Sequence, residues 1–183
     1  FKTRAATIYD RPEEPVKLYV AASGPAAARL AGRVADGFIC TSGKPPELYS
    51  ETLLPAVTEG AGKSGRDYDG IEKMIEMKVS FDTDKQRAKE DTRIWAALAL
   101  PSEKKMGVED PREMERLADE LPLDQAASRW IVSDDPDEHI ERIRPYVELG
   151  FTHLVFHAPG RDQDRFLKLY GEQILPRLRD RWG

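Results

Sequence analysis

Two short apolar segments of this chain each end in a turn of small and polar residues, and each turn leads into a predicted helix. Segment 17–22 is followed by Ser23-Gly24-Pro25, and segment 37–40 by Thr41-Ser42-Gly43-Lys44. Proline is tolerated in the first turn of a helix, so Pro25 and Pro45-Pro46 indicate where the two helices begin. Unpaired backbone N–H groups and the helix dipole attract anions at such a start. The lysine and two hydroxyls of the second turn therefore indicate an anion site.

Four apolar segments are predicted to be strands, each followed by a helix: 17–22, 37–41, 71–81 and 151–157. Alternation of strand and helix favours parallel strands covered by helices, in an open sheet or a closed barrel. An eight-stranded barrel takes roughly 250 residues, so four units correspond to about half of one. The chain starts at Phe1 without a methionine or a signal sequence, and we expect the partner half to precede it.

Between residues 101 and 133 the sequence changes to short, highly charged segments broken by glycine and proline. We expect an inserted excursion here, with helices over 111–120 and 123–130. On either side of it, Asp82-Thr83-Asp84 and Asp135-Pro136-Asp137-Glu138 are typical of helix starts, the second in the capping-box arrangement.

The composition of the chain argues against several classes of function, among them nucleic-acid binding and membrane insertion. The 183 residues carry a net charge of −5 with a pI near 5.4, and the basic residues are interspersed with acidic ones, which argues against nucleic-acid binding. No apolar run approaches the roughly 20 residues of a membrane helix. The single cysteine, Cys40, excludes an internal disulfide and fits a reducing, cytoplasmic setting. It lies in an apolar run and is predicted to be a small buried hydrophobe. No spacing suggests a metal site.

The three histidines are predicted to differ in role. His153 alternates with apolar neighbours, which favours a core or interface position. His157 ends the last strand, on the side where barrel enzymes place their chemistry, so it either lines the pocket or bonds backbone. His139 lies in a charged helix segment and is predicted to be solvated.

Several longer motifs resemble a known family. They are AASGPAAARLAGRVADGFICTSGK, DGIEKMIEMKVSFD, RWIVSDDPDE and HLVFHAPGRDQDRFLKLYGEQILPRLR. Together they are similar to the C-terminal half of the F420-dependent glucose-6-phosphate dehydrogenases, in the luciferase-like TIM-barrel superfamily. The resemblance implies an α/β fold, a (β/α)8 barrel, of which residues 1–183 supply the C-terminal half, with a helical insertion at about 101–133 after the seventh strand. It also implies oxidation of glucose 6-phosphate to 6-phosphogluconolactone, hydride transfer to coenzyme F420, and a homodimer.

The resemblance carries four substrate-binding residues onto this chain. They are Thr41, Lys44, Lys105 and Arg129, which would hold the sugar phosphate, and Lys104 competes with Lys105 for its place. Such a set suits a phosphate dianion, because arginine can bind two oxygens at once while lysine acts as a point charge. By itself, any one of these cations would be read as a solvated surface charge.

The cofactor turn of the family falls on Ser23, Gly24, Ala26 and Ala27, whose backbone would receive the phosphate-bearing tail of F420. The family pattern begins with two glycines, so Ser23 is a departure that would be strained if its φ were positive. The family's catalytic acid and base precede Phe1, and we expect no catalytic residue in this chain.

Two alternatives remain. A luciferase-like flavin monooxygenase, or another F420- or FMN-dependent oxidoreductase, would use the same barrel, since fold does not fix function. A non-catalytic phospho-sugar-binding module is the other. Two observations distinguish these alternatives: whether the deazaflavin accepts a hydride from the sugar phosphate, and whether the preceding half contains the family's catalytic histidine and glutamate.

Overall fold

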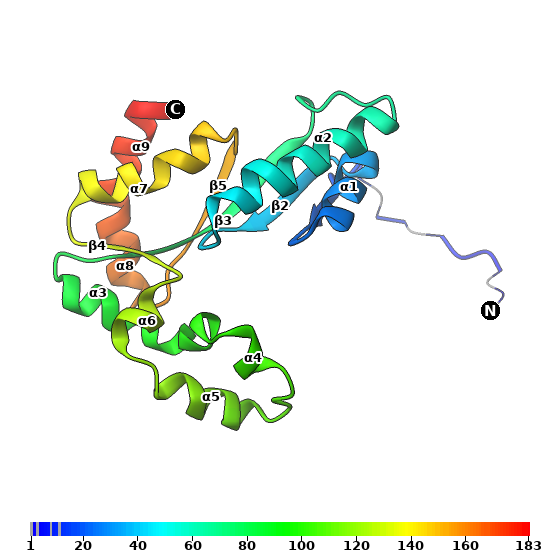
Figure 1. Ribbon diagram of the computed structural model, residues 1–183. Coiled ribbons are helices and arrows are strands. Elements are labelled where there is room, and N and C mark those ends of the chain that lie inside the picture. Colours follow the sequence, from blue (N-terminus) through cyan, green and yellow to red (C-terminus); the bar gives the residue numbers. More distant parts are fainter. Residues whose placement is uncertain (1, 3, 8, 11) are drawn as a thin grey trace.

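A parallel sheet forms the centre of the computed structural model, which describes residues 2, 4–7, 9–10 and 12–183 (Figure 1). Its main strands are β1 (Tyr19–Ala21), β2 (Gly37–Thr41), β3 (Glu72–Phe81) and β5 (His153–His157). β1 pairs with β2, β2 with β3, and β3 with β5, all in parallel. The four strands predicted from the sequence are thus confirmed.

Helices follow the strands on the outside of the sheet. They are α1 (Pro25–Val34), η1 (Leu48–Leu53), α2 (Leu54–Lys63), α7 (Pro136–Glu148), α8 (Gln163–Leu169), η3 (Tyr170–Ile174) and α9 (Leu175–Trp182). Figure 1 shows α1 and α2 beside β1 and β2, with α7 to α9 around β5. The core lies between these helices and the sheet, where Phe38 stacks on Phe151 with ring centroids 6.3 Å apart and Tyr49 meets the edge of Phe151.

The predicted inserted segment lies below the sheet in Figure 1, away from α1 and α2. After β3 come α3 (Lys85–Asp91), η2 (Thr92–Ala99), α4 (Ser102–Lys105), α5 (Pro111–Asp119), α6 (Leu123–Ala127) and a strand, β4 (Ile131–Ser133). Two helical pieces were predicted and both are present, although α6 ends three residues before Trp130. This part has a small core of its own, made of Ala96, Leu100, Ala118, Leu121 and Ala126.

The sequence did not predict β4, which is only three residues long. Its residues pair with Val79, Ser80 and Phe81 at the far end of β3. A segment so short carries no period of its own, and it becomes a strand because β3 extends beyond the pairing region of β2 and β5. Through β4 the inserted segment returns to the sheet beside the place where it left.

The two helix starts of interest are capped by aspartate. Asp84 accepts from the N–H groups of Gln86 and Arg87, and Asp135 accepts from those of Asp137 and Glu138. The reciprocal half of the predicted capping box does not form. The N–H of Asp135 donates to the Ser133 hydroxyl at 3.0 Å, while the carboxylate of Glu138 faces basic side chains.

The prediction for His139 is wrong, and so is the core position predicted for His153. His139 is fully buried instead of solvated, because the start of α7 packs against the end of β3 and against η3, and its ring lies between Phe81 and Tyr170. His153 is exposed and not in the core, because it lies at the start of β5, whose recorded pairing is with β3 alone; there its ring nitrogen contacts the hydroxyl of Thr152.

Cys40 is confirmed as a buried side chain, only 5% exposed, and burial raises the pKa of its thiol to about 12. Within the described ranges, none of the helices combines the length and the apolar character needed to cross a membrane.

Candidate functional site

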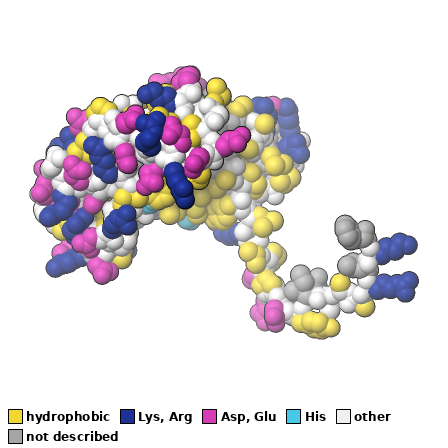
Figure 2. Space-filling model, turned by 90° about the horizontal axis from the view of Figure 1, so that it is seen from below, with side chains coloured by type: hydrophobic (Ala, Val, Ile, Leu, Met, Phe, Trp, Pro, Cys, Tyr) yellow, Lys and Arg dark blue, Asp and Glu magenta, His cyan; other side chains and the backbone are white. Residues whose placement is uncertain are grey.

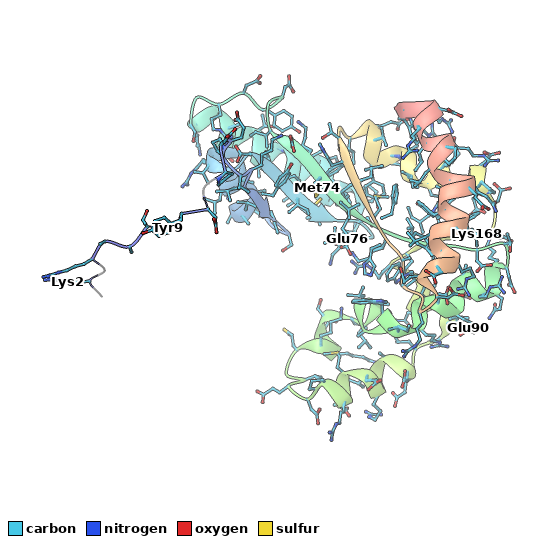
Figure 3. All side chains as sticks on the ribbon, turned by 180° about the vertical axis from the view of Figure 1, so that it is seen from behind. Lys2, Tyr9, Met74, Glu76, Glu90 and Lys168 are labelled. Carbon is cyan, nitrogen blue, oxygen red and sulfur yellow. The ribbon has the colours of Figure 1, made fainter. Side chains whose placement is uncertain are left out.

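A pocket of about 330 Å³ lies between the sheet and the inserted segment. It is lined by Thr41, Lys44, Glu76, Lys78, Trp95, Leu98, Lys105, Arg129 and His157. In Figure 3, Glu76 lies on β3 at the side of the sheet that faces the inserted helices. The four residues assigned to the sugar phosphate by resemblance therefore share one pocket, although they come from three separate segments.

Tyr49 fixes the loop that carries Thr41 and Lys44. Its hydroxyl donates to the carbonyl oxygen of Thr41 at 2.8 Å and accepts from the N–H of Lys44 at 3.2 Å. Between them, the N–H of Ser42 donates to the carbonyl oxygen of Glu76 at 2.8 Å, which continues the pairing of β2 with β3. The ring of Tyr49 is buried, so its hydroxyl ties the loop to the main hydrophobic core.

Arg129 enters the pocket from the turn that precedes β4. The guanidinium of Arg142 holds the next part of the backbone by donating to the carbonyl oxygens of Val132, at 2.7 Å, and Trp130, at 3.4 Å. The Nε of Arg129 is buried and has no hydrogen-bond partner within the described residues. A buried donor without an acceptor is costly, and an anionic ligand in the pocket would satisfy it.

Lys105 comes from α4, where its Nζ donates to the carbonyl oxygen of Leu98 at 3.0 Å. Lys104, its competitor for the role, is exposed and does not line the pocket. The geometry therefore favours Lys105 over Lys104.

The pocket concentrates positive charge. Burial lowers the pKa of Lys44, and the nearby charges of Arg129, Lys105 and Lys78 lower it further. Burial also lowers the pKa of Lys105, with Arg129 as the next cause. Within the described part of the chain, neither lysine nor Arg129 forms an ion pair with a carboxylate. The three positive charges repel one another, and a bound anion would neutralise them.

Glu76, Lys78 and Trp95 also line the pocket but were not among the predicted site residues. The carboxylate of Glu76 contacts His157 Nδ1 at 2.6 Å and accepts from Lys78 Nζ at 3.2 Å. Burial opposes ionisation of Glu76, but these contacts outweigh it and lower its pKa below the ordinary value. One signal was available in the sequence, because Glu76 and Lys78 alternate with the apolar residues Ile75, Met77 and Val79 and so share one face of the strand.

The predicted cofactor turn lies at the start of α1. Gly24 is the N-cap residue, with φ of −153°, and no side chain caps the helix. The N–H groups of Ser23, Gly24, Ala26 and Ala27 have no recorded acceptor among the described residues. Ser23 does not have a positive φ, so its departure from the two-glycine pattern causes no strain.

A second pocket, of about 460 Å³, adjoins this turn. It is mainly apolar and is lined by Ala21, Ala22, Ser23, Ile39, Cys40, Thr41, Glu76 and Val155. Thr41 and Glu76 line both pockets, so the two lie next to each other. Figure 2 shows hydrophobic side chains gathered on the hollowed underside of the molecule. The combination suits a flat, partly apolar ligand with an anionic tail that lies next to a phosphorylated one.

Comparison with known proteins places the chain among relatives of one kind. Residues 1–153 match the luciferase-like monooxygenase family. The chain is 70% identical over 179 residues to the F420-dependent glucose-6-phosphate dehydrogenase of Nakamurella multipartita, a match that covers 98% of this chain and 53% of that protein. It is also 70% identical over 181 residues to the enzyme of the same name from Beutenbergia cavernae, covering 99% of this chain and 54% of that protein. The chain thus spans about half the length of these curated relatives.

Solved structures show the same fold. An F420-dependent secondary alcohol dehydrogenase in complex with an F420-acetone adduct superposes with a TM-score of 0.78 and 28% identity, covering 92% of this chain and 51% of that one. The coenzyme F420-dependent tetrahydromethanopterin reductase from Methanopyrus kandleri gives a TM-score of 0.70 at 22% identity, over 88% of this chain and 51% of that one.

Proposed function

The chain belongs to the luciferase-like monooxygenase family, and we propose that it supplies about the C-terminal half of an F420-dependent glucose-6-phosphate dehydrogenase. Its fold is that of part of a luciferase-like (β/α)8 barrel. The complete protein would oxidise glucose 6-phosphate to 6-phosphogluconolactone with coenzyme F420. The names of relatives that match nearly the whole of this chain support the proposal.

One observation carries the substrate assignment. Thr41, Lys44, Lys105 and Arg129 line a single pocket, and the three cations lack carboxylate partners in the described part of the chain. A phosphate monoester carries close to two negative charges at neutral pH and offers three acceptor oxygens. Hydrogen bonds between ionised groups are the stronger kind, so this pocket would bind a sugar phosphate through its phosphate.

The residues present also fit the cofactor. The N–H groups of Ser23, Gly24, Ala26 and Ala27 would hold the anionic tail of F420, and the apolar pocket beside them would receive its ring system. When bound, the deazaflavin supplies the hydride acceptor.

The role of this half is to position the substrate. Contacts with the non-reacting phosphate would use remote binding energy to align the reacting carbon. The groups that exchange protons with the substrate would belong to the preceding half of the barrel.

The test is reduction of F420 by the complete protein. Addition of glucose 6-phosphate should abolish the deazaflavin absorbance. Lys44→Ala should raise the Michaelis constant for glucose 6-phosphate by about 10-fold or more but change that for unphosphorylated glucose little. Lys104→Ala is the matched control, because it removes an exposed lysine from the same protein.

Reduction of F420 by a secondary alcohol, and not by the sugar phosphate, would overturn the substrate assignment in favour of another family oxidoreductase. Sugar-phosphate binding without any reduction would favour a binding module. We further propose that the complete protein is a cytoplasmic homodimer, and light scattering of the purified protein tests the dimer.

A further inference from the structure

His157 lines the phosphate pocket and contacts residues from three other segments. Its ring meets the indole of Trp95 at 5.0 Å between centroids and that of Trp130 at 5.3 Å, both close to perpendicular. Its side chain is 28% exposed and lines the pocket with Lys44, Lys105 and Arg129. The two indoles leave little freedom for the ring to rotate.

Glu76 determines which ring nitrogen carries the proton. An ionised carboxylate can only accept hydrogen bonds, so the 2.6 Å contact with Glu76 Oε1 requires the proton on Nδ1. Glu76 is itself held by Lys78 Nζ at 3.2 Å, and that lysine is buried. In the neutral ring, Nε2 is then an acceptor, and it makes no hydrogen bond within the described residues.

This acceptor stands out among the other polar groups of the pocket. The amines of Lys44 and Lys105 and the guanidinium of Arg129 are donors only. Each oxygen of the Glu76 carboxylate already has one partner, and the Thr41 hydroxyl faces the backbone oxygen of Ser42 at 3.4 Å, whereas Nε2 of His157 has no partner among the described residues. A phosphate needs donors alone. A hydroxyl on the carbon skeleton beside the phosphate, in contrast, has a proton to donate.

We propose that His157 accepts a hydrogen bond from a hydroxyl group of the phosphorylated sugar, and that Glu76 is the positioning residue that fixes its tautomer. This inference rests on the proposed function and adds to it a residue that recognises the sugar and not its phosphate. Phosphate affinity and sugar recognition are thereby assigned to different side chains of one pocket.

Equilibrium binding to the complete protein, measured by titration calorimetry, tests the inference. His157→Phe keeps an aromatic ring between the two indoles but has no acceptor. It should weaken glucose 6-phosphate binding about 3- to 10-fold and leave binding of inorganic phosphate within about 2-fold. His157→Gln, which can place an amide oxygen near the position of Nε2, should recover most of the loss.

Glu76→Gln should weaken binding of glucose 6-phosphate and not that of inorganic phosphate, as His157→Phe does. His153→Phe, an exposed histidine of the same strand, is the control and should change neither affinity.

Deoxy analogues identify the hydroxyl. For the 1-, 2-, 3- and 4-deoxy derivatives of glucose 6-phosphate, one analogue should bind wild type and His157→Phe equally, because the partner of His157 is missing from the ligand. A wild-type to variant ratio that is the same for glucose 6-phosphate and every analogue would overturn the inference. So would an equal loss of inorganic phosphate and sugar phosphate. Reduction of F420 is a separate measurement, so the proposed reaction can fail while the binding result stands, and the reverse. Failure to bind glucose 6-phosphate at all would overturn both.

Discussion

Gly43 lies directly against the backbone of Arg129, so the loop after β2 and the inserted segment meet at a glycine. A Cβ at Gly43 would come within 2.4 Å of the Arg129 carbonyl oxygen, and the φ of Gly43 is +75°. Both facts require glycine at this position. The contact sets how far Lys44, the next residue, lies from Arg129.

Gly43→Ala should therefore damage the pocket as well as the fold. We expect a loss of roughly 2 kcal/mol or more in the free energy of unfolding, about 1 kcal/mol from the left-handed backbone and the rest from displacement of Arg129. Gly65→Ala is the matched control, since Gly65 has a φ of +65° but open space around it. Denaturant unfolding measures the stability of both variants, and titration with inorganic phosphate measures their affinity for the anion. Equal losses of phosphate affinity in Gly43→Ala and Gly65→Ala would contradict the expected damage to the pocket.

Arg129→Lys keeps the charge but removes the planar fork of donors. Because the Nε of Arg129 is buried without a partner, we expect the guanidinium to contact the phosphate through more than one nitrogen. The Michaelis constant for glucose 6-phosphate should rise about 5- to 20-fold, with little change for unphosphorylated glucose. A lysine that serves equally well would show that position 129 acts only as a point charge.

The affinity for sugar phosphate should fall at alkaline pH, earlier than an ordinary lysine would predict. The protonated form of Lys44 binds the anion, and burial and neighbouring cations lower its pKa from 10.5. As pH rises through this lowered pKa, Lys44 loses its charge, and affinity drops by up to about tenfold per pH unit. Arg129→Gln, which removes a repelling charge, should move the decline to higher pH. Lys44→Arg, which stays protonated, should remove the part of the decline that Lys44 causes and leave the part due to Lys105, whose pKa burial also lowers. Calorimetry between pH 8 and about 10.5 measures the difference.

Stability should decline on mild acidification because of His139. Burial, and then the nearby charge of Arg142, lowers the pKa of His139 from 6.5 to about 3. Between these values the unfolded chain binds a proton at this residue and the folded protein does not. The free energy of unfolding should therefore fall as pH falls, by up to about 1.4 kcal/mol per pH unit.

His139→Phe should remove this dependence, since phenylalanine fits between the rings of Phe81 and Tyr170 and does not titrate. His153→Phe, at an exposed position, should leave the dependence unchanged. Denaturant unfolding at pH 7 and pH 5 provides the comparison. If the free energy of unfolding falls equally between pH 7 and pH 5 in wild type and His139→Phe, groups other than His139 cause the acid sensitivity.

The sequence by itself predicted the four main strands, most helix starts and a change of pattern between residues 101 and 133. These features are local. Short apolar runs bounded by glycine and proline define 37–41 and 151–157, and Asp84 and Asp135 mark helix starts because an aspartate side chain can bond its own neighbouring N–H groups. Resemblance, and not spacing, selected Thr41, Lys44, Lys105 and Arg129 from the many basic and polar residues of the chain.

Only the tertiary structure decided which side chains share a pocket and which are buried. His139 looks solvated in its charged segment, yet the packing of α7 against β3 and η3 encloses it. Glu76 and His157 belong to neighbouring strands, and their contact follows from the register that pairs Glu76 with Val155 and Lys78 with His157. Burial and pairing depend on elements remote in sequence, so no local pattern records them. The physical reason is that a residue type fixes which interactions are possible, while the packing of distant segments decides which of them are made.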